Sequence, residues 1–178
     1  SEVEKIKKDV DRMITEWEKR SRDIAKTVDE LIEDSRRLNE TIRRDVDRVA
    51  RELKERIKRT TDEELIERIE RRIDEILDEI RELLKRDEEK NERVLREAER
   101  LLRETKERVK EVRKRVRDKG VSDDVLKKIE EALKRLADRD DDILRRIETL
   151  VRKTRRESEE LLKEVEDKMR KLKEELRR

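Results

Sequence analysis

Apolar residues return at alternating steps of three and four along almost the whole chain. In the first third, the series runs through Val3, Ile6, Val10, Ile14, Trp17 and onward to Ile57. Such steps place the apolar side chains on one face of an α-helix, whereas a half-buried strand needs strict alternation. The average step lies between the supercoiled and the straight helical repeat, so the pattern predicts long amphipathic helices that pack as in coiled coils.

The composition agrees with long helices. The chain is 61% charged and contains one Gly, no Pro, no Cys and no His. Its 55 basic residues nearly balance its 53 acidic ones, whereas a disordered chain usually has a large net charge and no periodicity. Because hairpin turns with glycine and strand-forming aromatic residues are missing, we find no candidate strand. We therefore expect an all-α protein.

The pattern breaks a first time near Thr60. Thr61 followed by Glu64 has the form of a capping box, so we expect one helix over residues 2–59 and another from residue 62. Neither Gly nor Pro stands at this break, and the apolar phase continues through it. A single continuous helix across Thr60 is therefore the alternative.

The second break is marked by three kinds of residue. Gly120 stands where the end of a helix favours a left-handed residue. Ser122 can cap the helix that follows, and Val121 and Leu126 have the spacing of a hydrophobic staple. We expect the second helix to cover residues 62–118 and the third to cover residues 123–177.

Three helices of similar length with short connections predict a long antiparallel up-down-up three-helix bundle, which we expect to form a single domain over residues 1–178. Each helix has about two apolar residues in every seven, which gives a narrow apolar stripe. A helix that also formed an outer interface would need a wider stripe. We therefore expect a monomer, and self-association is the alternative.

The apolar series is interrupted in the middle of the second helix. The spacing assigns Leu83 to the buried face, and nine consecutive polar residues, 85–93, follow Leu84. Within this interval the seam positions fall on Asp87 and Asn91. Either the helix breaks here, or a site lies here, or the core itself becomes polar.

Polar residues of the other two helices are predicted at the same level. If the chain folds back at both breaks, Asp87 lies level with Ser35 and near Thr154. Further polar residues near this level are Asn39, Asn91 and Ser158. A helix break would not require this coincidence, so a polar layer in the core is favoured.

A second set of polar seam residues consists of Ser21, Thr105 and Asp140, which are predicted at comparable heights. An unsatisfied buried polar group costs about 1–3 kcal/mol. We therefore expect the polar residues of both sets to bond to one another and to fix the helix register, as a buried Asn does in coiled coils. The alternative is that they point partly to solvent along a loosened groove.

The sequence offers little for chemistry. Without His or Cys it has no base beside a nucleophile, and no Glu-x-x-His metal motif of the kind that helical bundles use. A single glycine excludes a phosphate-binding loop, and the basic stretches lack aromatic residues for stacking on bases. No apolar run reaches the roughly 20 residues that span a bilayer. We expect no enzyme activity, cofactor, metal, nucleic-acid partner, membrane contact or targeting signal.

The capping box, the single loop glycine, the Glu–Arg pairs four residues apart and the polar seam residues follow rules used in design. The chain resembles computationally designed helical bundles with buried hydrogen-bond networks. Spectrin-type repeats are the nearest natural resemblance, but their helices are about half as long. The resemblance implies a synthetic scaffold: a rigid three-helix rod with no natural activity and no native localisation, soluble in the cytoplasm when expressed, that requires no partner. The alternative is a coiled-coil interaction module that homo-oligomerises or pairs with a helical partner.

Overall fold

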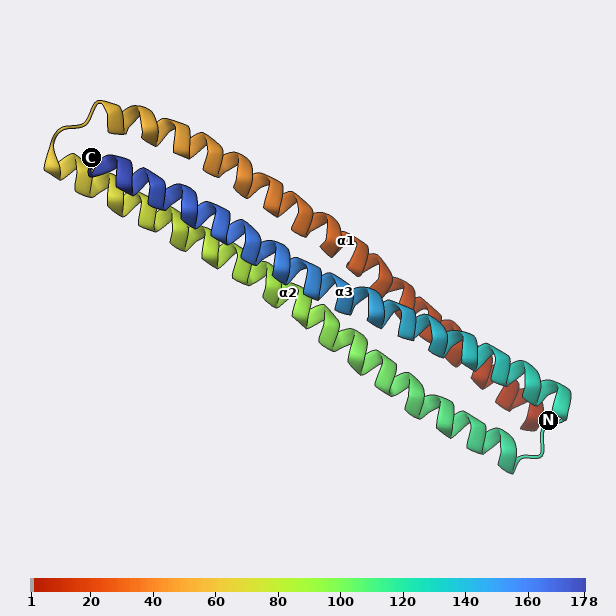
Figure 1. Cartoon of the computed structure of the whole chain (residues 1–178). Coiled ribbons are helices and arrows are strands. Elements are labelled where there is room, and N and C mark those ends of the chain that lie inside the picture. The colour runs from red at the N-terminus through yellow and green to blue at the C-terminus, as the bar shows by residue number, and fades with distance from the viewer. Residues whose placement is uncertain (1) are drawn as a thin grey trace. The chain divides into compact units, whose positions relative to one another are not determined.

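The computed structural model describes residues 2–178, which form three α-helices and two short connections (Figure 1). The helices are α1 (Glu2–Lys58), α2 (Glu63–Asp118) and α3 (Asp123–Leu176). Their ends lie within one residue of the predicted bounds, and no strand occurs among the described residues. The all-α three-helix prediction is confirmed, and the break near Thr60 excludes one continuous helix.

The helices contribute to two compact units. The first unit combines the chain up to Leu31 with Asn91–Leu150, and the second combines Ile32–Lys90 with Val151–Arg178. Each unit therefore contains a segment of all three helices. That the chain unfolds as a single domain stays a prediction.

Ion pairs between helices show that neighbouring segments are antiparallel. In the first unit, Lys119 pairs with Glu2 and Arg20 pairs with Glu104, both at 3.3 Å, so numbers rise along α1 as they fall along α2. The second unit has the same antiparallel relation between α2 and α3. Its pairs include Arg81–Glu166, Lys173–Asp74 and Arg177–Glu70. Each unit thus has the up-down-up arrangement that short connections favour.

The core of each unit consists of the periodic apolar residues. In the first unit the larger cluster contains Ile6, Val10, Val109, Val112, Val116, Ile129 and Leu133, and a smaller one contains Trp17, Leu101 and Leu136. The second unit contains Ile42, Val46, Leu53, Ile69, Ile73, Ile76, Ile80, Leu84, Leu161, Val165, Met169, Leu172 and Leu176. Burying one such side chain stabilises the fold by about 1.5–3 kcal/mol, so these clusters drive the packing of the helices.

The prediction that Leu83 is buried is wrong, because Leu83 is 42% exposed and Leu84 lies in the core of the second unit. In an α-helix, a residue four positions further along lies about 40° past one full turn. A residue three positions further along lies about 60° before the full turn. Leu84 therefore follows Ile80 more closely on the buried face. Val3 and Leu65, near the starts of their helices, are also exposed although the apolar series includes them.

The start of α2 is capped one residue later than predicted. The carbonyl oxygen of Asp62 accepts the first helical hydrogen bond from the Ile66 N–H at 3.0 Å. Asp62 Oδ1 also accepts a hydrogen bond from the Glu64 N–H at 3.1 Å. Asp62 is therefore the N-cap in place of Thr61, and its carboxylate suits the positive end of the helix dipole.

The connection between α2 and α3 depends on Gly120, whose φ is +63°. The Gly120 N–H donates to the carbonyl oxygen of Arg117 at 3.4 Å, and the carbonyl oxygen of Ser122 accepts from the Leu126 N–H at 2.9 Å. Val121 and Leu126 pack against the larger cluster of the first unit. A left-handed glycine thus ends one helix while an apolar contact fixes the start of the next.

Replacing Gly120 with valine is expected to lower the free energy of unfolding by about 1–2 kcal/mol, as measured by chemical denaturation. A Cβ at this position would meet no atom within 4 Å, so the loss comes from backbone strain and not from a clash. Gly120→Asn is the matched control, because asparagine tolerates the left-handed region, and it should lose less. Equal losses in both variants would contradict this explanation.

Candidate functional site

Three buried polar residues meet in the first unit, one from each helix, and we name them the Asp140 cluster: Ser21 on α1, Thr105 on α2 and Asp140 on α3. The Ser21 hydroxyl donates to Asp140 Oδ1. Thr105 Oγ1 lies 2.9 Å from Asp140 Oδ2 and 2.8 Å from the carbonyl oxygen of Leu101. Asp140 is only 4% exposed, so its carboxyl group is largely shielded from bulk solvent.

Apolar and charged side chains of the first unit surround this cluster. Trp17, Leu101 and Leu136 form the small apolar group one helical turn from its members. The guanidinium carbon of Arg20 lies 4.8 Å from the centre of the Trp17 ring, and its nitrogens pair with Glu104 at 3.3 Å. Trp17 is only 7% exposed, and a cation over the face of a tryptophan ring is attracted by the ring's quadrupole.

The electrostatics of Asp140 follow from its burial. Burial raises the pKa of this carboxyl, and it outweighs the hydrogen bonds from Ser21 and Thr105, which lower the pKa. Asp141 raises the pKa further, whereas Arg139 lowers it. Desolvation disfavours the charged form of an acid, so the proton is held more tightly than in an exposed aspartate.

The second unit contains a more open pair on α1 and α2. The Ser35 hydroxyl donates to Asp87 Oδ2 at 2.8 Å, with Ser35 buried and Asp87 half-buried. Burial raises the pKa of Asp87, whereas the Ser35 hydrogen bond and Lys90 lower it, and Asp34 raises it. Lys90 in turn pairs with Asp34 at 3.3 Å. The carboxyl thus faces both a buried hydroxyl and solvent.

The nine polar residues in the middle of α2 do not break the helix, which is continuous from Glu63 to Asp118. The core becomes polar there instead. Thr154 and Ser158 are buried on α3 in the second unit, and Asn91 is buried on α2 in the first unit. Asn39 is half-buried on α1. The predicted residues therefore reach or border the core. Hydrogen bonds join Ser21 and Thr105 to Asp140, and Ser35 to Asp87.

Ser158 differs from the bonded serines, because its Oγ is buried and has no hydrogen-bond partner among residues 2–178. Replacing Ser158 with alanine should raise the free energy of unfolding by about 1 kcal/mol, since an unsatisfied hydroxyl is removed and alanine favours helix. Guanidinium denaturation measures the change.

The matched control is Ser21→Ala, which removes a bonded hydroxyl from an equally helical and buried position. It should lower the free energy of unfolding by about 1 kcal/mol. If Ser158→Ala is as destabilising as Ser21→Ala, the Ser158 hydroxyl has a partner in solution, such as a buried water.

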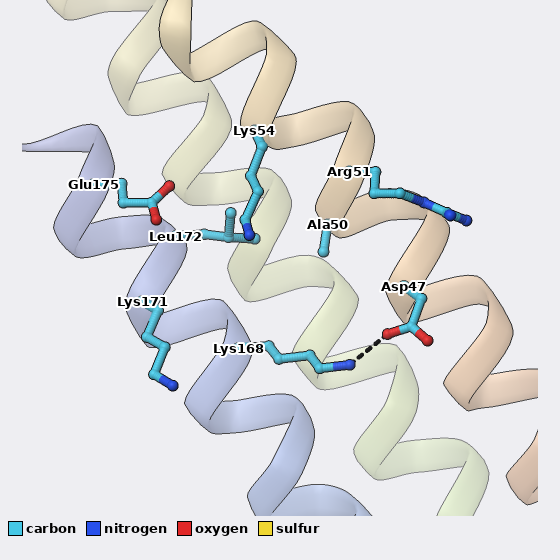
Figure 2. A pocket seen from close by; sticks show the side chains of 8 residues that line it. All are labelled: Asp47, Ala50, Arg51, Lys54, Lys168, Lys171, Leu172 and Glu175. Carbon is cyan, nitrogen blue, oxygen red and sulfur yellow. Dashed lines mark hydrogen bonds and ion pairs between the residues drawn. The ribbon is translucent and has the colours of Figure 1, made fainter.

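A groove of about 350 Å³ lies between α1 and α3 in the second unit, lined by Asp47, Ala50, Arg51, Lys54, Lys168, Lys171, Leu172 and Glu175. Figure 2 shows Lys168 directed at Asp47, with which it forms an ion pair, whereas Arg51 points away from Lys168. The cations of this groove do not converge on one point. Specific anion binding needs convergent donors, so the groove is a gap between helices and offers no phosphate clamp.

No group of three or more His, Cys, Asp or Glu side chains within residues 2–178 is arranged to hold a metal ion. Over the same part of the chain, no helix combines the length and the apolar character required to cross a membrane.

Comparison with known proteins supports the fold. No protein-family model and no curated protein matches the chain. A solved structure described as a "Computationally designed three helix bundle" superposes with a TM-score of 0.70 over 99% of this chain and 92% of that chain, at 19% sequence identity. The chain therefore has the fold of a three-helix bundle.

Proposed function

We propose that the chain is a de novo designed structural scaffold without a natural biochemical activity, in which buried polar residues set the register of the helices. The Asp140 cluster carries this proposal. Its polar atoms are directed at one another across three helices. A binding or catalytic site would instead have convergent polar groups facing a pocket.

The cluster can set register because its bonds exist at one alignment only. A slip of one turn moves a helix by about 5.4 Å, which separates Ser21 from Asp140. Each buried group left unsatisfied costs about 1–3 kcal/mol. The apolar residues, by contrast, recur at nearly every turn and tolerate such a slip. Polar residues thus exclude alignments that apolar packing alone would accept.

The surface supports a monomer that needs no partner and stays soluble in an expression host. Ion pairs between helices, such as Arg146–Asp29 and Arg20–Glu104, lie at the rims of the cores with exposed side chains. Exposed pairs are individually weak, so they serve solubility more than stability. Alternating charge of this kind disfavours a continuous apolar interface.

The second candidate function is a coiled-coil interaction module. Ile32 and Leu83, both in the second unit, are 43% and 42% exposed, although most exposed residues of the chain are charged. Exposed large apolar residues can mark a contact with another helix. Under this alternative the chain would pair with itself or with a helical partner through such residues.

Sedimentation equilibrium over a wide concentration range separates the two functions. The scaffold should sediment at the chain mass of 22.0 kDa at every concentration. A mass that rises with concentration would contradict the monomer. The double variant Ile32→Lys and Leu83→Lys is the control, because a return to the chain mass would assign the association to those two residues.

A further inference from the structure

The Asp140 cluster contains more short oxygen–oxygen contacts than its hydroxyl groups can fill with protons. Three such contacts exist: Ser21 Oγ to Asp140 Oδ1, Thr105 Oγ1 to Asp140 Oδ2, and Thr105 Oγ1 to the Leu101 carbonyl oxygen. Each contact needs one proton between its oxygens. A hydroxyl supplies one proton, whereas a carbonyl or carboxylate oxygen supplies none. Ser21 and Thr105 together therefore supply two protons for three contacts.

We propose that Asp140 holds a proton in the folded chain at pH values where an ordinary aspartate is ionised, and that this proton couples the stability of the first unit to pH. A protonated Asp140 supplies the third proton. Asp140 Oδ2–H donates to Thr105 Oγ1, Thr105 donates to the Leu101 carbonyl oxygen, and Ser21 donates to Asp140 Oδ1. All three contacts are then hydrogen bonds.

With an ionised Asp140, one contact of Thr105 would hold two acceptor oxygens within 3 Å and no proton between them. Thr105 would have to turn away from the Leu101 carbonyl, which it contacts in the back-bonded geometry common for threonine in helices. The geometry therefore favours the neutral acid independently of its burial.

Charged groups around the cluster do not supply a dedicated cation for a carboxylate. On α1, Arg20 is engaged with Glu104 of α2. Ser21 and Arg22 line a second groove, which lies between α1 and α3 in the first unit. On α3, Arg139 stabilises a carboxylate at Asp140, while Asp141 opposes it. Further groups that line the groove on α3 are Arg135, Asp138, Asp142 and Arg146. Charges of both signs thus surround the cluster, and their effects on the Asp140 pKa oppose one another, so burial has the largest effect on that pKa.

Asp87 is the internal comparison. It is half-buried, accepts one hydroxyl from Ser35, and has Lys90 close by. Its carboxyl also reaches solvent, which stabilises the charged form of an acid. A carboxylate is therefore less unfavourable at Asp87 than at the buried Asp140.

The consequence for stability has a definite sign. A group that binds its proton more tightly in the folded state stabilises that state fully below the unfolded pKa, which is about 3.9 for aspartate. This contribution is lost as the pH rises through the folded pKa. The first unit should therefore lose stability through Asp140 as the pH rises across that window, which is opposite to the usual behaviour of a salt-bridged aspartate.

A carboxyl ¹³C NMR titration of the whole chain tests the proposal directly. The Asp140 resonance, assigned by its absence in Asp140→Asn, should titrate clearly above the pH of about 3.9 typical of a free aspartate. A midpoint at or below that value would overturn the proposal. The titration itself uses the unmodified chain, and the variant serves only to assign the resonance.

The pH dependence of unfolding gives a second readout. Asparagine keeps an acceptor for Ser21 and a permanent donor toward Thr105, so Asp140→Asn mimics the neutral acid. The stability of Asp140→Asn relative to the unmodified chain should rise with pH above about 4 and then level off. Asp87→Asn is the control and should show a smaller rise. A relative stability of Asp140→Asn that falls with pH would mean that the carboxylate is the native form.

Discussion

Replacing Leu133 with alanine is expected to lower the free energy of unfolding by about 2–5 kcal/mol. Leu133 has no exposed surface and packs in the larger cluster of the first unit, so its loss leaves a cavity that the rigid helices fill only in part. Alanine is the best helix former, which means that the loss reports packing and not helix propensity. Guanidinium denaturation followed by circular dichroism measures it.

Leu83→Ala is the matched control because it removes the same atoms at an exposed position. These atoms contact mainly solvent, so their removal leaves no cavity. Its effect should stay within about 0.5 kcal/mol, as for ordinary surface positions. A loss comparable to that of Leu133→Ala would place Leu83 at a contact, which would favour the interaction module over the scaffold.

The same experiment tests whether the chain unfolds as a single domain. Leu172→Ala removes a nearly inaccessible side chain from the core of the second unit. If the chain is one cooperative domain, each variant shifts one common transition detected by all probes. Two transitions, with each variant shifting only one of them, would show that the two units unfold separately.

The second large effect concerns the partners inside the Asp140 cluster. Asp140→Leu should lower the free energy of unfolding by about 1–3 kcal/mol, because the buried Ser21 hydroxyl loses its acceptor. Thr105 is less affected, since it keeps the carbonyl oxygen of Leu101. The double variant Ser21→Ala with Asp140→Leu should recover this loss or exceed the original stability, because the hydroxyl that Asp140→Leu leaves unsatisfied is then gone. Denaturation of the single and double variants measures both changes.

The role in register needs a readout other than stability. The chain has no cysteine, so spin labels at Arg22→Cys on α1 and Asp138→Cys on α3 report a distance within the first unit without background. With the Asp140 cluster intact, the distance distribution should be narrow. With the apolar pair Ser21→Ala and Asp140→Leu, it should broaden. An unchanged narrow distribution would mean that apolar packing alone sets the register.

The helices are predictable from the sequence because their determinants are local. The steps of three and four give the helical faces, and Gly120 marks a left-handed residue that few other residues adopt. It is harder to predict which of two adjacent residues caps a helix or is buried. Thr61 and Asp62 are both good caps, and the choice depends on how the connection enters α2. Leu83 and Leu84 are both leucines, and the helices packed against them decide which is buried.

The polar contacts are predictable only to the level of the helical turn. Short connections limit the alignment of the helices to within about one turn, so Asp87 could be placed level with Ser35, and the two are bonded. Which atoms bond depends on side-chain rotamers and on all three helices together. The second contact of Thr105 with the Leu101 carbonyl and the unbonded Ser158 hydroxyl therefore have no signal in the sequence. Ion pairs between helices, such as Arg20 with Glu104, are hidden for the same reason.

Trp17 is the only tryptophan of the chain, and its ring is packed against Leu101 and Leu136 within the first unit. Intrinsic fluorescence is therefore a local optical signal, whereas far-ultraviolet circular dichroism averages over every helical turn. A melt in which the two signals separate would identify which part of the molecule opens first, without any added dye or engineered label.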